Sequence, residues 1–223
     1  LDIQYPRSGD LTPELAGAIA QEFSDFEKGL YSYDYDTADY GYSHTIDVQS
    51  FVDYFLINEF TTNYDAGWLS TYLYRDIGGK YKMVIWDFNS ACDNYTYSTV
   101  QPQRFEMQLP VWYYMLIKDE DFVQHLISRY EQLRKSYLSE DYLNQYMDET
   151  VAYLGDAIQR NFQVWGYTFE QEMLYPAQRN PADHQQAVEQ MRDFIHTRGA
   201  WMDENIEVLL QYCHESKVKK FNH

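Results

Sequence analysis

An abrupt change of hydrophobic period near residue 61 limits the folds open to this chain. Residues 48–60 place apolar side chains at helical spacing, whereas "NYDAGWLSTYLYRDIGGKYKMVIWDF" alternates with a period of two around Gly78-Gly79. The apolar face of 48–60 is wide, which is typical of a central helix that other elements cover on most sides. Alternation around a Gly-Gly turn is typical of a β-hairpin. The sequence therefore predicts a buried helix followed directly by a hairpin, with strands near 70–76 and 80–87.

The remaining apolar patterns are mostly helical. A helix is expected over 13–31, because Pro13 suits a first helical position and Asp10 or Thr12 precedes it as a cap. The stretch 31–45 has no period and predicts a loop, and Asp47 is the expected cap of the central helix. Further helices are predicted over 109–118, 119–137, 140–161 and 181–213, the last two beginning at Ser139 and at Asn180-Pro181.

This order of elements predicts an α+β fold that is mostly α. We expect one domain over residues 1–223, in which 1–106 hold helices, a loop and the hairpin, and 107–223 form a helical bundle. Because the chain does not start with Met, we also expect it to be part of a longer protein.

Charge and cysteine content exclude several classes of function. The net charge of −18 repels phosphate backbones and anionic lipids, so nucleic acid is not an expected partner. No run of eighteen apolar residues is present, so no membrane span is predicted. Cys92 and Cys213 are far apart and form no CxxC pair, which argues against a zinc knuckle and a disulfide scaffold, so we interpret them as buried thiols.

Hairpin pairing brings two carboxylates toward one rim. If Arg75 faces Lys80 across the turn, Trp68 faces Asp87, and Asp65 lies within roughly 10 Å of Asp87 at about 3.4 Å per strand residue. Carboxylates this close repel each other unless a cation intervenes, so the pair predicts a metal site. Phosphoryl transfer needs such a pair, one carboxylate holding a metal on the phosphates and one orienting the attacking hydroxyl. The alternative is that Asp65 only caps a turn and Asp87 only ends a strand.

Several stretches together resemble the CotH kinase family, which is named after a bacterial spore-coat protein. They are "IDVQSFVDYFLINEFTTNYD" and "STYLYRDIGGKYKMVIWDFNSACDN", with flanking matches in "YPRSGDLTPE" and "MRDFIHTRGAWMDENI". The resemblance implies an abbreviated, atypical protein-kinase-like fold that uses ATP and Mg²⁺ or Mn²⁺. It further implies transfer of phosphate to Ser or Thr of protein substrates in the spore coat or at the cell surface.

The resemblance also assigns residues. Asp65 corresponds to the catalytic aspartate that orients the acceptor hydroxyl, and Asp87 to the metal-binding aspartate. Asn89 stands where many relatives have a second aspartate, as a further metal ligand. Ser70 and Asn94 occupy positions expected to contact the cofactor, although many relatives have asparagine in place of Ser70.

Two departures from the family pattern matter. Serine is a weaker magnesium ligand than the asparagine that it replaces. No glycine-rich phosphate loop or lysine-bearing strand precedes the first helix, and Lys80 and Lys82 follow the catalytic loop in the wrong order. The resemblance therefore implies the C-terminal lobe alone, without the N-terminal nucleotide-binding lobe, and nearly inactive by itself.

Two other functions stay open at this point. Ser70 and Asn89 favour a non-catalytic pseudokinase that acts as a scaffold in the spore coat or cell envelope. A carbohydrate-associated domain is suggested only by Trp112, Trp165 and Tyr167, which core packing explains more simply. The sequence gives no indication of oligomeric state.

Overall fold

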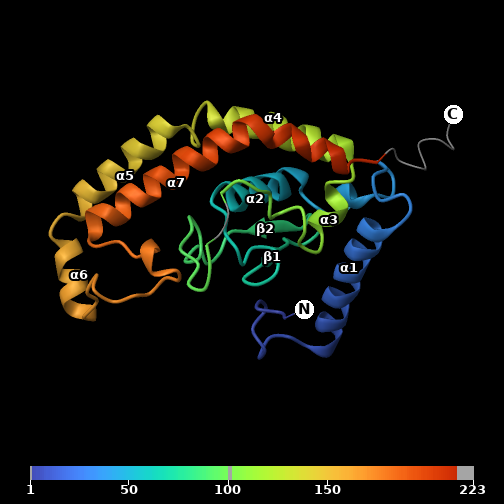
Figure 1. Cartoon of the computed structure of the whole chain (residues 1–223). Helices are drawn as coiled ribbons and strands as arrows, with labels where there is room; N and C mark the ends of the chain where they lie inside the picture. Colours follow the sequence, from blue (N-terminus) through green and yellow to red (C-terminus); the bar gives the residue numbers. More distant parts are fainter. Residues whose placement is uncertain (1, 100–101, 215–223) are drawn as a thin grey trace.

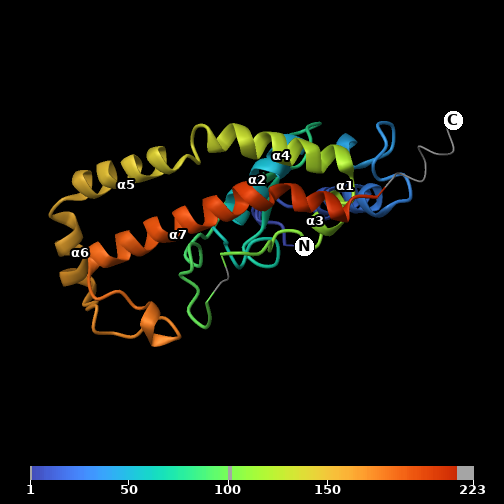
Figure 2. The ribbon, with the colours of Figure 1, turned by 45° about the horizontal axis from the view of Figure 1, so that its top comes forward.

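The computed structural model describes residues 2–99 and 102–214, and within them the fold is mostly helical with one two-stranded sheet. The predicted α+β class is therefore confirmed. Figure 1 shows a compact body of α1, α2, the hairpin and α3, with a long helical layer of α4, α5 and α7 above it. Seen after a 45° turn in Figure 2, α7 runs beside both α5 and α4. None of the helices in the described ranges has the length and apolarity needed to cross a bilayer.

The N-terminal helix α1 spans Pro13–Tyr31, which confirms the expected range. Thr12 caps it, since its side-chain oxygen accepts a hydrogen bond from the backbone N–H of Leu15 at 3.2 Å. The predicted loop that follows contains one short 3₁₀ turn, η1, at Tyr42–His44. A parallel bridge between Ile46 and Tyr81 then ties the chain to the hairpin.

Helix α2, Val48–Phe60, is the centre of the core. Asp47 caps it as predicted, accepting a hydrogen bond from the Ser50 N–H at 3.0 Å. Eight of its thirteen residues are buried, because β2 packs on one side while α4 and α7 pack on others. The wide apolar face read from the sequence thus has neighbours around most of the helix.

The hairpin forms where expected, but its strands are shorter and its register differs by one residue. Strand β1, Tyr72–Tyr74, pairs with β2, Lys82–Val84, so that Tyr74 faces Lys82. The predicted pairing of Arg75 with Lys80 and of Trp68 with Asp87 is wrong. It would have put Tyr74 on the same face as Tyr81, yet Tyr81 packs against Phe26 in the core while Tyr74 is 46% exposed. A shift of one residue is what places the two rings on opposite faces.

The C-terminal half is helical, with more breaks than the sequence patterns indicate. The elements are α3 (Tyr113–Leu116), α4 (Glu120–Arg134), α5 (Glu140–Leu154), α6 (Ala157–Trp165), η2 (Ala177–Arg179), α7 (His184–Asn205) and η3 (Ile206–Tyr212). Ser139 caps α5 as predicted. The expected helix 140–161 is divided at Gly155, which has a φ of +46°. Asp183 rather than Asn180-Pro181 begins α7, because the Asn180 side chain is used to brace the preceding loop.

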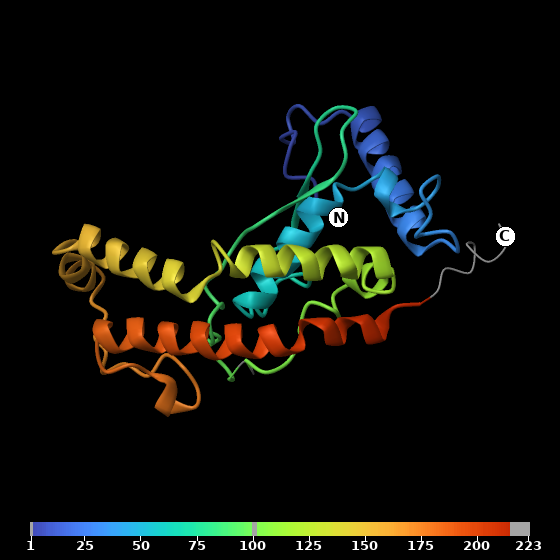
Figure 3. The ribbon, with the colours of Figure 1, turned by 90° about the horizontal axis from the view of Figure 1, so that it is seen from above.

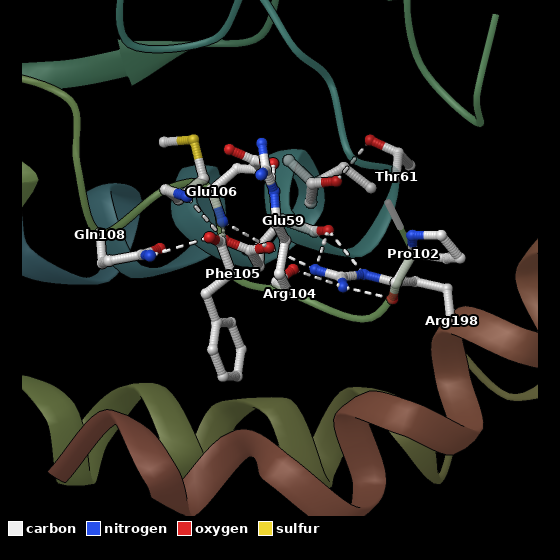
Figure 4. Close-up of polar contacts among 10 residues, drawn as sticks. Glu59, Thr61, Pro102, Arg104, Phe105, Glu106, Gln108 and Arg198 are labelled. Carbon is white, nitrogen blue, oxygen red and sulfur yellow. Dashed lines mark hydrogen bonds and ion pairs between the residues drawn. The ribbon is translucent and has the colours of Figure 1, made fainter. Parts of the chain in front are cut away.

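A buried ion pair joins α2 to α7. Arg198 and Glu59 are in contact with both side chains fully buried, and Arg198 also donates to the carbonyls of Pro102 at 2.7 Å and Arg104 at 2.8 Å (Figure 4). Glu59 in turn accepts from the Met107 N–H at 2.7 Å and from the Glu106 N–H. Burial raises the pKa of the Glu59 carboxyl, against the opposing effect of Arg198 and these two N–H groups. The pair thereby fixes the irregular segment 102–107 against the core.

The far end of the helical layer is an arm with little core of its own. Neither α5 nor α6 has a buried residue, whereas α4 has five. Figure 3 shows α5 and the first half of α7 extending away from the body toward α6. The irregular connection between α6 and α7 folds back from this end.

Candidate functional site

Ser70 and Asp87 meet at the end of the hairpin. The Ser70 hydroxyl donates to the Asp87 carboxylate at 3.2 Å, across 17 residues of sequence. Asp87 is exposed and Ser70 is half-buried, so the carboxylate remains open to solvent on one side. This contact joins the loop before β1 to the loop after β2.

Asp65 lies in the turn between α2 and the hairpin. Its backbone carbonyl accepts from the N–H groups of Leu69 at 2.8 Å and Trp68 at 3.2 Å, which forms a single helical turn. Its carboxylate accepts a long hydrogen bond, 3.4 Å, from the hydroxyl of Ser90, three residues beyond Asp87. The structure therefore links Asp65 to the segment that carries Asp87, through a serine that the sequence patterns did not single out.

Asn89 and Asn94 belong to one tight loop. The Asn94 side-chain amide donates to the Asn89 backbone carbonyl at 2.8 Å, while both side chains are exposed. Asn94 thus holds the backbone beside Asn89 through its N–H₂ group. The Asn89 side chain lies on the same exposed loop as Asp87.

The backbone around these residues is strained. In the described chain, positive φ angles outside glycine occur at Thr62, Ser70, Asp87, Cys92 and Asp93. Each such residue costs about 1–2 kcal/mol relative to ordinary backbone, and surrounding contacts must hold it. All five lie in the two segments that flank the hairpin, one between α2 and β1 and the other after β2, and two of them are expected site residues. Strain concentrated in this way is typical of functional sites.

Two polar atoms just before Asp65 have no partner. The side-chain oxygens of Thr62 and Asn63 are buried without a hydrogen bond, although the Asn63 amide donates to Asn58 at 3.0 Å. Native proteins rarely leave such atoms unsatisfied unless water, an ion or a functional role accounts for them. The stretch that leads to Asp65 is already part of the family resemblance, and the structure adds that these two oxygens in it lack partners.

The oxygen ligands present suit magnesium held jointly with a substrate. Within residues 2–99 and 102–214, no group of three or more His, Cys, Asp or Glu side chains is arranged to hold a metal. Mg²⁺ in phosphoryl-transfer sites is usually bound by one or two carboxylates, with phosphates and water completing the shell. Asp87 with Asn89 fits that pattern, and an all-protein metal cage does not.

The lysines of the hairpin have other partners. Lys80 donates to the Ser43 carbonyl at 2.7 Å, and Lys82 lies 3.8 Å from the Asp47 carboxylate and over the Tyr74 ring. Both contacts are consistent with the expectation that neither lysine is the one that grips phosphates. A cation that does contact the segment after β2 is Arg179, which pairs with Asp93.

Comparison with known protein families gives a match over most of the chain. The family model described as CotH kinase protein matches residues 20–202, most of the chain. No curated protein and no solved structure matches the chain.

Proposed function

The chain belongs to the CotH kinase family, and from this premise we propose that it is the catalytic-lobe part of an atypical protein kinase. The proposed reaction transfers the γ-phosphate of ATP to a Ser or Thr hydroxyl of a coat or surface protein. The observation that carries the proposal is the pair of contacts Ser70–Asp87 and Ser90–Asp65, which join the loops on both sides of the hairpin.

The proposed roles follow from the position of each side chain. Asp87 and Asn89 would hold Mg²⁺ or Mn²⁺, which supplies charge neutralisation on the phosphates. Ser70 keeps the Asp87 carboxylate oriented by its hydrogen bond at 3.2 Å, and Asn94 fixes the backbone at Asn89. From these positions, Ser70 and Asn94 are also proposed to contact the bound ATP.

Asp65 acts on the acceptor. The hydroxyl oxygen attacks the γ-phosphorus, an O–P bond forms, and the bond from phosphorus to the bridging oxygen breaks as ADP leaves. The hydroxyl proton passes to the Asp65 carboxylate, whose orientation is set by Ser90.

The exposed face of the hairpin favours nucleotide binding at the end where Asp87 lies. Tyr72 and Trp86 are in edge-to-face contact, with ring centroids 5.8 Å apart, and both side chains are exposed. Trp86 directly precedes Asp87, so an aromatic surface adjoins the proposed metal ligands. Adenine is a planar ring that stacks on such surfaces. We propose that an N-terminal lobe of a longer protein completes this face and supplies fixed positive charges that hold the phosphates.

The test is phosphate transfer by a longer protein that contains this chain and its upstream lobe. Label from γ-³²P-ATP should reach a protein substrate in the presence of Mg²⁺, and Asp87→Ala should lower the rate by roughly 100-fold or more, because the metal loses its main ligand. Asp76→Ala, at the opposite end of the same hairpin, is the matched control and should keep full activity. Full activity of the Asp87 variant would remove that residue from the mechanism.

A second candidate is a scaffold with no transferase activity. Ser70 and Asn89, where many relatives have stronger metal ligands, favour it. Trp165, which was expected to pack in a core, is 78% exposed at the end of α6 and offers a contact surface. Calorimetry of the longer protein with Mg²⁺ and ATP separates the two functions, since a scaffold that has lost nucleotide binding gives no heat of binding.

A further inference from the structure

The connection between α6 and α7 returns to the candidate site. We call residues 166–183 the α6–α7 connection and residues 87–97 the site loop. The backbone N–H of Tyr175 donates to the Thr96 carbonyl at 2.9 Å, and Arg179 pairs with Asp93 across 86 residues of sequence. In Figures 1 and 2 the connection, in orange, approaches the loops that follow β2, in green.

Arg179 grips Asp93 through several atoms at once. Its Nε lies 3.2 Å from one carboxylate oxygen and its Nη2 lies 3.1 Å from the other, and Nη2 also donates to the Asp93 backbone carbonyl. The Arg179 side chain is only 10% exposed. A two-pronged contact of this kind, shielded from solvent, fixes direction as well as distance.

The connection is braced so that it can serve as an anchor. Arg179 Nη1 donates to the Tyr175 carbonyl at 2.5 Å. The Asn180 side chain accepts from the N–H groups of Met173 at 2.7 Å and Leu174 at 2.8 Å and donates to the Leu174 carbonyl at 2.8 Å. A connection with this many internal hydrogen bonds holds a defined shape, although its only regular element in the described chain is the short turn η2.

The site loop needs such an anchor. Asp87, Cys92 and Asp93 all have left-handed backbone angles, with φ of +59°, +53° and +60°. Within the loop, Asn94 bonds to the Asn89 carbonyl at 2.8 Å, and from outside it the Thr61 carbonyl accepts a hydrogen bond from the Cys92 N–H at 2.7 Å. Residues strained in this way keep their conformation only when contacts from outside over-determine it. Arg179 supplies such a contact through its paired hydrogen bonds to Asp93.

We infer that Arg179 is a positioning residue, which holds the site loop through Asp93 so that Asp87 and Asn89 present their oxygens together. The role of those oxygens rests on the proposed function. That Arg179 keeps the site loop ordered, which we call the clamp, does not depend on it. Arg179 itself touches neither substrate nor metal in this assignment.

Cysteine labelling measures the clamp directly. Burial raises the pKa of Cys92 to about 11, and burial raises that of Cys213 to about 11 as well, so both thiols should react slowly with iodoacetamide at pH 8. Cys213 contacts the Ile117 carbonyl instead of the site loop and is the internal reference. Arg179→Gln should speed labelling of Cys92, measured by mass spectrometry, while Cys213 keeps its rate.

Two further variants separate the clamp from general loosening of the arm. Arg192→Gln removes a similar partly buried arginine that pairs with Asp148 at 2.6 Å, and should leave Cys92 protected. Arg179→Lys keeps the charge without the planar fork, so Cys92 in this variant should be labelled at an intermediate rate. The Lys variant can be measured even if the Gln variant unfolds. An unchanged Cys92 rate in both Arg179 variants, or an equal increase in the Arg192 variant, overturns the inference.

Metal binding tests the consequence for the site. Titration with Mn²⁺ alone, followed by electron paramagnetic resonance, should give a dissociation constant roughly 10- to 100-fold larger for Arg179→Gln. This is the usual effect of losing a residue that orients metal ligands. Arg192→Gln should bind as the natural sequence does. If the natural sequence binds no Mn²⁺, the proposed metal site fails, while the labelling result still decides whether Arg179 holds the loop. If Mn²⁺ binds with unchanged affinity in the Arg179 variant, the positioning role is contradicted and the proposed function is not.

Discussion

Several residues around the candidate site have left-handed backbone angles, which residues with side chains rarely adopt. Gly67, between Asp65 and Ser70, has a φ of +81°, and its N–H donates to the Thr71 hydroxyl at 2.9 Å. A Cβ atom there would lie 2.3 Å from the Cβ of Pro110. Both the conformation and the close approach require glycine, so this position fixes how the turn that carries Asp65 sits on the segment around Pro110.

Gly67→Ala should therefore destabilise the protein. Left-handed backbone at a residue with a side chain costs about 1–3 kcal/mol, and the contact with Pro110 adds to it. Urea unfolding is the measurement. Gly17→Ala is the matched control, since nothing lies within 4 Å of its Cβ in helix α1, and it should stabilise by about 0.5–1 kcal/mol. Equal effects of the two substitutions would contradict the conformational account.

At the scale of elements, buried polar contacts decide how helices meet. Glu59 on α2 and Arg198 on α7 are 139 residues apart, and both also bind backbone groups of the segment 102–107. Neither charge has access to water, so each depends on the other and on the backbone dipoles around it. The pair therefore sets the position of α7 over α2 in addition to neutralising charge.

Removing one partner should be costly. Arg198→Met and Glu59→Gln should each lower the free energy of unfolding by about 3–5 kcal/mol, because each leaves a buried group without its partner. Chemical denaturation of both single variants and of the double variant gives the coupling energy. The double variant should cost clearly less than the sum of the single ones. Additive losses would show that the two side chains act independently.

Arg192→Gln provides the comparison for an ion pair in which one partner, the carboxylate, is solvated. Its partner Asp148 has a side chain that is 73% exposed. Exposed ion pairs contribute only about 0–1 kcal/mol, so this variant should remain close to the natural stability.

At the scale of the whole molecule, core packing is distributed unevenly. Helix α2 has eight buried residues and α4 has five, whereas α5 and α6 have none (Figure 3). Local stability follows the amount of buried apolar contact. The arm formed by α5, α6 and the first half of α7 is therefore expected to open independently of the body.

Native-state hydrogen exchange should resolve this difference. Backbone amides of α5 and α6 should exchange by local opening, with much lower protection than those of α2 and α4, which should require global unfolding. The Arg179–Asp93 contact predicts one exception, namely that the η2 region exchanges more slowly than α6. Uniform protection across α2, α5 and α6 would show that the arm unfolds only with the body.

Much of the fold could be predicted because its signals are local. The bounds of α1 and α2, the caps Thr12, Asp47 and Ser139, and the existence of the hairpin depend on residues within a few positions of one another. The division of the helix at Gly155 and the start of α7 at His184 were missed, because a single glycine and a side chain used elsewhere leave weak traces in a hydrophobic pattern.

The sequence by itself determined which segments are helices, where the hairpin turns, and that acidic and amide side chains gather at its end. Only the tertiary structure decided the hairpin register, the bond of Ser90 to Asp65, the grip of Arg179 on Asp93 and the pairing of Glu59 with Arg198. Local structure follows from short-range sterics and hydrophobic period, which neighbouring residues specify. A polar contact between distant residues instead depends on which faces the packed elements turn toward each other, and burial of rings such as Tyr81 settles that choice.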